Sequence, residues 1–487
     1  GGGLLGGSRD APGSEGRAYA ERGVVFVAIN YRVGAFGFLY PEGGDANCGL
    51  WDQVAALQWV QSEIGAFGGD RGRVTIMGES AGADSAYWLC CSPVANRLFQ
   101  QAIIQSPSSF AITPDQAREL TREFAEVAGA RSASLRDMQG MNVWQVLLAQ
   151  MGGHFRIHPT TGPGWRLLTA MGGSLPDFEP CADPSPCGLF RFPEGCEPRG
   201  WIMPVAVVDG ELLTQQPLDA LASGAARHLR IVLGGNREEC AFSELPGSYG
   251  AEASEAGGLG EVLSRAAWEV AGAPLLARAP PGLLRGRVEQ LAAEYGAECG
   301  GGGPPPAQRL LDLLASDFGF LAAVELISRR LARPGGSRRV FRYQFQGYGE
   351  AGGAFHAAEL PLMLGEGDEG ASEGQRRARG EWLDSWAAFV HGGDPNTRAM
   401  AGAWRPHDEA GRPALLWDGE RGWSARGGAA ATSGRRGLQA TARLWEELWG
   451  LERVAPEGPA EGRAAAAWPW DWGRLLGALA GVEGERL

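Results

Sequence analysis

Alternation of apolar strand patterns with helix patterns is the feature that most restricts the folds open to this chain. Residues 73–77 (RVTIM) have the β-branched, apolar character of a strand, residues 81–91 read as a helix that stops before Pro93, and residues 102–105 (AIIQ) form another apolar run. A strand, a helix and a strand in this order are typical of a parallel sheet covered by helices. The sequence therefore predicts an α/β fold.

The same pattern extends in both directions along the chain. Residues 24–30 (VVFVAIN) predict another buried strand, and the three- and four-residue spacing of apolar side chains from Leu50 to Phe67 predicts a helix of about four turns. Residues 250–308 and 452–487 carry the weakest patterns. Further strands are expected at 230–233 and 340–345, and further helices at 317–332 and 381–391.

Composition argues against several classes of protein. No apolar run approaches the roughly 18 residues that a membrane span needs. All 44 basic residues are arginine, and with 57 acidic residues the net charge is -13, which repels nucleic acid. Cys181, Cys187 and Cys196 lie close together but lack the paired spacing of zinc ligands. Neither nucleic acid, a membrane span nor a metal is expected.

One motif within the strand and helix pattern carries chemistry. Gly78, Glu79, Ser80, Ala81 and Gly82 form a G-x-S-x-G run between the predicted strand and the predicted helix. In a nucleophile elbow the glycines let strand and helix come close while the serine hydroxyl stands exposed on a strained turn. Glycine makes up 76 of the 487 residues, so the interpretation depends on this context. Ser80 is the candidate nucleophile.

A serine hydroxyl needs a base, and the order along the chain favours one of the six histidines. In such folds the acid follows one strand and the histidine follows a later one. His356 lies in a glycine-rich loop shortly after the predicted strand at 340–345, and Glu238 or Glu239 follows the predicted strand at 230–233. The less well placed histidines are His154, His158, His228, His391 and His407.

Two stretches could supply backbone N–H groups for the oxyanion of an acyl-transfer intermediate. The glycine run at residues 1–3 is similar to an HGGG-type loop, and Ala81 directly follows the candidate nucleophile. On its own, the glycine run is equally consistent with an ordinary glycine-rich loop.

Together these stretches resemble the type B carboxylesterases, a family of α/β hydrolases that includes the cholinesterases. The block at residues 52–83 is the most specific part of the resemblance, which extends over about residues 1–450. The stretches that carry it, in family order, include GGGLLGGS, GVVFVAINYRVGAFGFL, NCGLWDQVAALQWVQSEIGAFGGDRGRVTIMGESAGA, GGNREECAF and FHAAELPLMLG.

The resemblance implies an α/β-hydrolase fold with a mostly parallel sheet and helices on both faces. It implies a serine hydrolase that cleaves small-molecule carboxylic esters through an acyl-enzyme, without a cofactor or metal. In this role Ser80 is the nucleophile, His356 the general base, and Glu239, rather than Glu238, the acid that orients the base. The implied oxyanion donors are the N–H groups of Gly2, Gly3 and Ala81.

The chain also departs from the family pattern. Family members have a further N-terminal segment, so residues 1–450 are expected to be a hydrolase domain without its first strands, and residues 451–487 a weakly structured tail. Cys240 stands where the family usually has glycine, and no cysteine matches the usual disulfide between Ala130 and Gln139. Compartment and oligomeric state stay open.

Two alternatives belong to the same family. In a cholinesterase a quaternary ammonium group stacks on aromatic faces, and Phe242 is a candidate face. In adhesion proteins that resemble neuroligins the triad is typically broken. Since Ser80, Glu239 and His356 are all present, an ester hydrolase is the favoured function.

Overall fold

The computed structural model describes most of the N-terminal third of the chain and several segments after it. The described residues are 2–10, 15–108, 111–152, 205–240, 316–333, 336–337, 339–348, 353–365, 371–400, 404–407, 414–419, 421–424, 438–439 and 441–443. The weakly patterned stretches at 250–308 and 452–487, and the expected tail, lie outside these residues.

One six-stranded sheet organises the described residues, with its strands in the order β1-β2-β3-β4-β5-β6. Strands β1 to β5 are parallel, and β6 pairs antiparallel with β5. The strands are β1 (Thr75–Glu79), β2 (Gln101–Gln105), β3 (Arg230–Asn236), β4 (Val340–Phe345), β5 (Leu415–Asp418) and β6 (Gly422–Ser424). The α/β class is therefore confirmed, and the carboxyl ends of the first five strands share one edge of the sheet.

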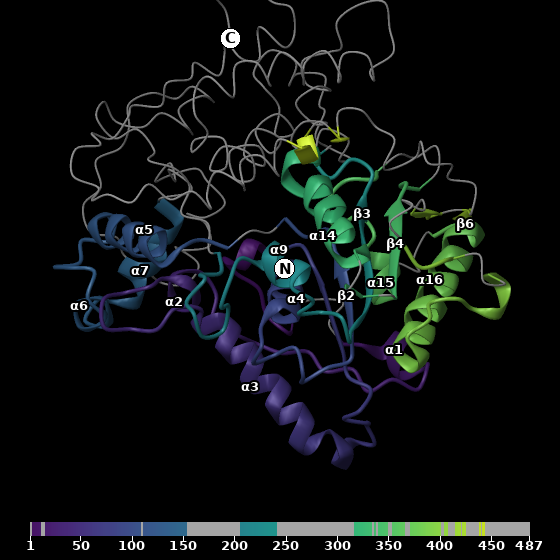
Figure 1. Ribbon diagram of the computed structural model, residues 1–487, viewed down its shortest axis with the longest axis horizontal. Coiled ribbons are helices and arrows are strands. Elements are labelled where there is room, and N and C mark those ends of the chain that lie inside the picture. Colours follow the sequence, from purple (N-terminus) through teal and green to yellow (C-terminus); the bar gives the residue numbers. More distant parts are fainter. Residues whose placement is uncertain are drawn as a thin grey trace, which may run out of the picture.

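Helices cover both faces of this sheet, and in Figure 1 strands β3 and β4 lie between α14 and α16. The α-helices are α1 (Arg17–Ala20), α2 (Gly34–Phe38), α3 (Cys48–Glu63), α4 (Ala81–Cys91), α5 (Pro114–Val127), α6 (Leu135–Gln139), α7 (Val143–Gly152), α9 (Pro217–Ala222), α14 (Ala322–Ala332), α15 (Leu360–Leu364) and α16 (Glu373–Gly392). The shorter helical turns are η1 (Gly2–Leu4), η2 (Ile64–Phe67), η6 (Asp317–Leu321) and η8 (Arg398–Met400).

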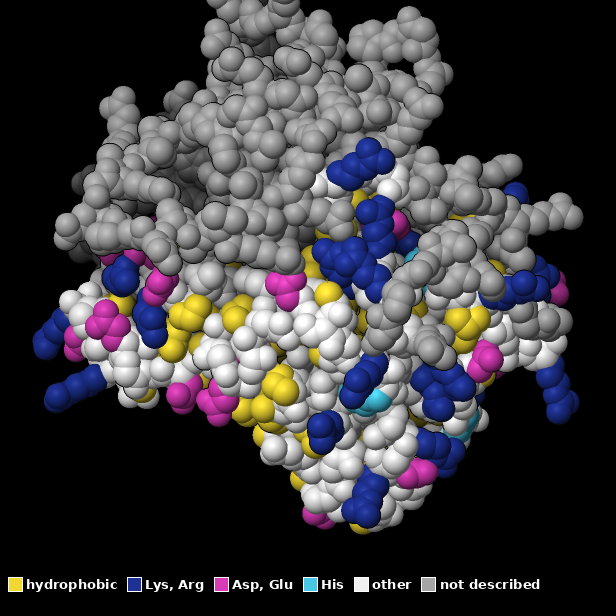
Figure 2. All heavy atoms as spheres, in the orientation of Figure 1, with side chains coloured by type: hydrophobic (Ala, Val, Ile, Leu, Met, Phe, Trp, Pro, Cys, Tyr) yellow, Lys and Arg dark blue, Asp and Glu magenta, His cyan; other side chains and the backbone are white. Residues whose placement is uncertain are grey.

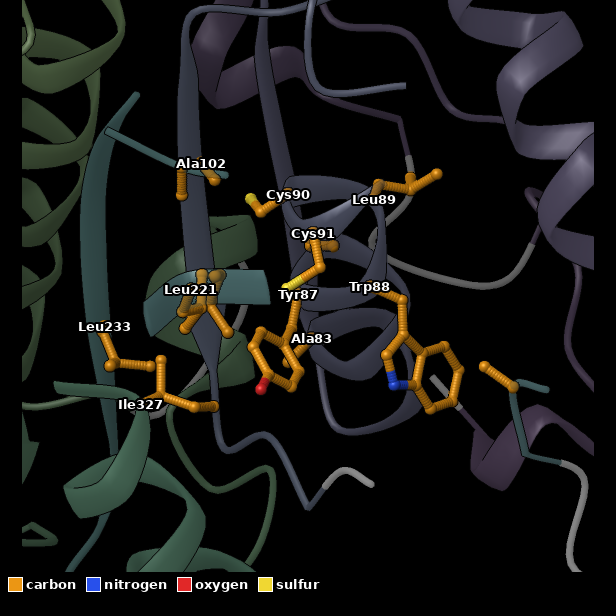
Figure 3. Close-up of a cluster of buried hydrophobic side chains, with 14 of the residues drawn as sticks. Ala83, Tyr87, Trp88, Leu89, Cys90, Cys91, Ala102, Leu221, Leu233 and Ile327 are labelled. Atoms are coloured by element: carbon orange, nitrogen blue, oxygen red, sulfur yellow. The ribbon is translucent and has the colours of Figure 1, made fainter. Parts of the chain in front are cut away.

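Alternate side chains of each central strand enter two separate cores. In β3, Leu233 packs with α4 and α14 in one core, and Val232 packs with α16 in the other. Figure 3 shows the first core, in which Tyr87 and Cys91 of α4 lie near Leu233 and near Ile327 of α14. Burial on both faces explains why the strands read as continuous apolar runs rather than alternating ones.

Local sequence signals set the ends of several helices. Helices α5 and α16 both begin with a capping box, in which Thr113 and Ser372 accept hydrogen bonds from backbone N–H groups three residues on. Helix α16 ends at Gly393, whose φ of 72° is a left-handed conformation that glycine adopts at little cost. These signals set where α5 and α16 begin and where α16 stops.

The expected elements are largely found. The predicted helix at 81–91 and the predicted strand at 340–345 match α4 and β4, and the other three strands from 73 onwards agree within a few residues. The helix that begins at Leu50 is α3 followed by η2, and the predicted helix at 317–332 is the π-helical turn η6 followed by α14.

One expected strand is wrong. Residues 24–30 form no strand, and none of the described strands pairs with them. Val24 and Phe26 pack against the core that holds α16, whereas Val25, Val27 and Ile29 are exposed. An apolar run becomes a strand only when a second strand satisfies its backbone groups.

Within the described segments, no helix combines the length and the apolar character that crossing a bilayer requires.

Candidate active site

Ser80 stands at the turn between the carboxyl end of β1 and the start of α4. Its backbone has φ 57° and ψ -125°, a strained conformation for a residue with a side chain. The turn is held by the Ser80 N–H, which donates to the carbonyl of Gln105 at 2.9 Å. A Cβ on Gly78 would lie 2.2 Å from the backbone of Gly82, so only glycine lets strand and helix come this close.

His356 lies within hydrogen-bonding distance of both Ser80 and Glu239. Its Nε2 is 2.8 Å from Ser80 Oγ, and its Nδ1 is 2.8 Å from Glu239 Oε2. The backbone adds a third link, because the His356 N–H donates to the Glu239 carbonyl at 2.7 Å. A hydroxyl, an imidazole and a carboxylate in this order can transfer a proton from the hydroxyl to the ring as the oxygen attacks an electrophile.

Glu239 is fully buried and is held from two sides. Its Oε1 accepts from Ser106 Oγ at 2.6 Å and from the Asn236 N–H at 2.7 Å, which leaves Oε2 facing His356. The adjacent Glu238 instead pairs with Arg237 at 3.4 Å. Of the two candidate acids, only Glu239 contacts the imidazole.

Two further buried carboxyl groups surround the site. Glu79 Oε1 lies 3.3 Å from His356 Nε2, and Glu359 accepts from Asn236 Nδ2 at 2.6 Å and from Gln105 Nε2 at 3.3 Å. Burial, together with the charge of Glu239, raises the pKa of Glu79. Burial and then the charges of Glu79 and Glu239 raise the pKa of Glu359 to about 8.

These carboxylates control the charge on His356. Burial alone lowers the pKa of an imidazole, but here the charge of Glu79 and the hydrogen bond that His356 donates to Glu239 outweigh burial and raise the pKa of His356 to about 9. The ring of Phe320 packs over the imidazole, with 4.4 Å between ring centroids, and restricts how it can rotate.

The candidate oxyanion donors lie at the same end of α4. Ala81 is the first residue of that helix, so its N–H has no acceptor inside the helix and is free to bind a ligand. Gly2 and Gly3 lie in η1, which packs against α4 through the buried Leu4. Gly2 has no heavy atom within 4 Å of the position that a Cβ would take, so the loop is open there.

Comparison with known proteins relates parts of this chain to esterases. The model of the carboxylesterase family matches residues 1–147. A fumonisin B1 esterase of Sphingopyxis macrogoltabida is 34% identical over 247 residues, which are 49% of this chain and 38% of that protein. A para-nitrobenzyl esterase of Bacillus subtilis is 28% identical over 86% of this chain and 74% of its own length.

The fold comparison extends the similarity to the later strands. A crystal structure of a carboxylesterase of Geobacillus stearothermophilus matches with a TM-score of 0.64 and 26% identity, covering 90% of this chain and 81% of that one. Residues 1–147 are thus similar to the carboxylesterase family, and the wider fold is similar to that of solved esterases. Its sheet is the α/β-hydrolase sheet, although the chain spans only 38% of the length of the fumonisin esterase.

Several residues around the candidate site do not stand out in the sequence. Glu239 accepts hydrogen bonds from Ser106 and Asn236, and Asn236 also donates to Glu359. These three partners come from different strand ends and loops. The one local signal is position: Ser106 directly follows β2, and Glu359 comes three residues after His356. Strand ends that share an edge are where such partners are to be sought.

The remaining sequence candidates are not part of this group of residues. His228 contacts the carbonyl of Asn96, and His391 contacts that of Arg22. Six further candidates fall outside the described residues: His154, His158, Phe242, Cys181, Cys187 and Cys196. Among the residues that the structure does describe, no three His, Cys, Asp or Glu side chains are grouped as metal ligands would be.

Proposed function

We propose that this protein is a serine hydrolase of carboxylic esters that works through Ser80, His356 and Glu239. The observation that carries the proposal is the continuous hydrogen-bonded chain from Ser80 Oγ through both nitrogens of His356 to Glu239 Oε2. The match of residues 1–147 to the carboxylesterase family and the similarity to esterases support the same reaction class.

In the proposed reaction Ser80 Oγ attacks the carbonyl carbon of the ester while its proton passes to His356 Nε2. The imidazolium then protonates the alkoxide as the C–O bond breaks, which leaves an acyl group on Ser80. A water molecule then attacks the acyl group in the same two steps and releases the acid. Throughout, Glu239 accepts the hydrogen bond from the Nδ1–H of His356. The N–H groups of Ala81, Gly2 and Gly3 donate to the oxyanion.

A fluorophosphonate probe tests this proposal, because the reaction with phosphorus needs the same activated serine. We expect the chain to be labelled at Ser80, and Ser80→Ala to abolish labelling and to lower hydrolysis of p-nitrophenyl acetate at least about a thousandfold. Ser62→Ala is the matched control, since Ser62 is exposed on α3 and bonds only within that helix. Labelling that survives Ser80→Ala contradicts the proposal.

The two alternatives give different results in the same assay. A cholinesterase-like enzyme hydrolyses choline esters in strong preference to neutral esters of equal length. A non-catalytic adhesion protein is not labelled at all, which the close contacts among Ser80, His356 and Glu239 make the less favoured outcome.

A further inference from the structure

The sheet end opposite the proposed active site carries an exposed group of arginines. We call it the basic face, and it consists of Arg71, Arg73, Arg97, Arg227, Arg333 and Arg339. These residues precede strands β1 to β4, whereas Ser80, Glu239 and His356 follow β1, β3 and β4. We propose that the basic face binds the surface of an anionic lipid bilayer.

Hydrogen bonds join the segments of the basic face into one surface. Gln61 Nε2 of α3 donates to the carbonyls of Arg71 and Leu98, at 3.0 and 2.8 Å. His228 contacts the carbonyl of Asn96 at 2.7 Å. The Ile231 N–H donates to the carbonyl of Arg339 at 2.9 Å, which brings the turn before β4 beside the others.

The charge of this face is opposite to that of the whole chain. The net charge of the chain is -13. The segments that carry the basic face are residues 61–73, 92–100, 223–229 and 333–339. Among their described residues only Glu63 and Asp70 are acidic, and Asp70 is paired with Arg73. The arginines without an ion-pair partner among the described residues are Arg71, Arg97, Arg227, Arg333 and Arg339. Figure 2 shows dark blue side chains and a cyan histidine gathered over the lower part of the molecule. An anionic partner complements this face.

Exposed apolar side chains lie beside the arginines and favour a bilayer over nucleic acid. Phe67 is 62% exposed and Trp59 44%, and their rings touch with 5.6 Å between centroids. Trp59 lies near the end of α3, which reaches the bottom of the molecule in Figure 1, and Phe67 ends η2, the turn that follows it. Val94, three residues before Arg97, is also exposed. Aromatic rings beside arginines are typical of proteins that lie in the interface of a membrane.

Docking in this way orients the proposed active site. A strand of five residues is about 17 Å long, so Ser80 and the bilayer stand on opposite ends of the sheet. The protein is held at the membrane while its proposed active site faces water. Esters that dissolve in water can then still reach Ser80.

Vesicle flotation with the full chain tests the inference. We expect binding to phosphatidylcholine vesicles that contain phosphatidylglycerol, little binding to pure phosphatidylcholine, and release by high salt, because screening removes attraction beyond a Debye length. Arg97→Gln with Arg227→Gln should weaken binding more than about tenfold, since each arginine near the surface contributes about fivefold. Phe67→Ser should weaken it several-fold with the charge unchanged.

The matched control removes the same charge elsewhere. Arg131 and Arg136 are exposed near α6, away from the basic face, and Arg131→Gln with Arg136→Gln should leave vesicle binding unchanged. Equal loss in the two double variants overturns the proposal, because net charge alone would then explain it. Binding of double-stranded DNA without binding of vesicles also overturns it and assigns the face to nucleic acid. Circular dichroism of each variant checks folding without relying on esterase activity.

Discussion

At the scale of single residues, the charge state of His356 determines when the proposed base can act. Nε2 accepts a proton from Ser80 only when the imidazole is neutral. Because its pKa is raised to about 9, activity should increase with pH, and the midpoint of the acidic limb of kcat/KM should lie above the ordinary histidine value of 6.5. A pH profile of ester hydrolysis measures that midpoint.

Glu359→Gln should move this midpoint to lower pH. Glutamine has the shape of glutamate and can still accept from Asn236, but it removes one of the negative charges that raise the pKa of His356. Glu238→Gln is the matched control, since Glu238 is buried beside Glu239 but pairs with Arg237. A shift of the same size in both variants would show that Glu359 has no special effect on His356.

The elbow glycine gives a second prediction at this scale. Gly78→Ala places a Cβ 2.2 Å from the backbone of Gly82, and neither β1 nor α4 can move without disturbing Ser80. We expect a loss of about 3 kcal/mol in the free energy of unfolding, with loss of hydrolysis. Gly65→Ala serves for comparison, because its Cβ would meet nothing within 4 Å. Chemical denaturation of both variants measures the difference, and similar stability for the two would contradict the steric argument.

The order of residues along the chain indicates which serine and histidine meet, but not every group that holds them. Ser80 and His356 each have a local pattern, an elbow or a loop after a strand. Glu238 and Glu239 are neighbours that the spacing alone does not separate; the resemblance selects Glu239, and Ser106, which follows β2, holds it in the structure. Such partners follow from the three-dimensional fold and leave no spacing in the sequence.

At the scale of elements, one buried ion pair joins α14 to β4. Glu325 accepts from Arg342 at 2.8 Å and from Arg329 at 2.9 Å, and Glu325 and Arg342 are each almost fully buried. Glu325→Gln leaves Arg342 without its carboxylate. We expect a loss of about 3 to 5 kcal/mol in the free energy of unfolding, measured by chemical denaturation.

The same ion pair predicts a pH dependence of stability. Burial alone would raise the pKa of Glu325, but Arg342 and Arg329 outweigh it and lower the pKa to about 2. A lowered pKa adds stability above the unfolded value of 4.5, and that stability is lost as the pH falls towards 2. Glu325→Gln should lack this part of the acid sensitivity. Glu21→Gln removes an exposed ion pair with Arg17. This variant should keep the acid sensitivity and lose less than about 1 kcal/mol in the free energy of unfolding.

Elements with their own periodicity or burial pattern could be predicted from the sequence. Helices α3 and α4 and strands β2 to β4 pack against one or both cores. The spacing of their apolar residues in the sequence reflects this burial. Residues 24–30 have the same composition but form no strand, because pairing depends on a neighbouring chain segment rather than on the run itself. Strands β5 and β6 are too short to stand out.

At the scale of the whole molecule, residues 25–29 are the segment through which we expect copies of the protein to associate. Residues 25–29 make no backbone hydrogen bond to another described residue, and their exposed side chains are Val25, Val27 and Ile29. An exposed apolar edge of this kind pairs with other chains. At pH 7 the net charge of -13 keeps copies apart, and this repulsion vanishes near the pI of about 5.1.

Aggregation should therefore be fastest near pH 5, and Val27→Lys should slow it several-fold, because a charge on an edge opposes pairing. Light scattering at a series of pH values measures the rate. Val143→Lys makes the same change at the exposed first residue of α7, where the backbone is helical and offers no strand edge. If Val143→Lys slows aggregation as much as Val27→Lys, added charge explains the effect. If only Val27→Lys does so, the unpaired backbone of residues 25–29 is the contact between copies.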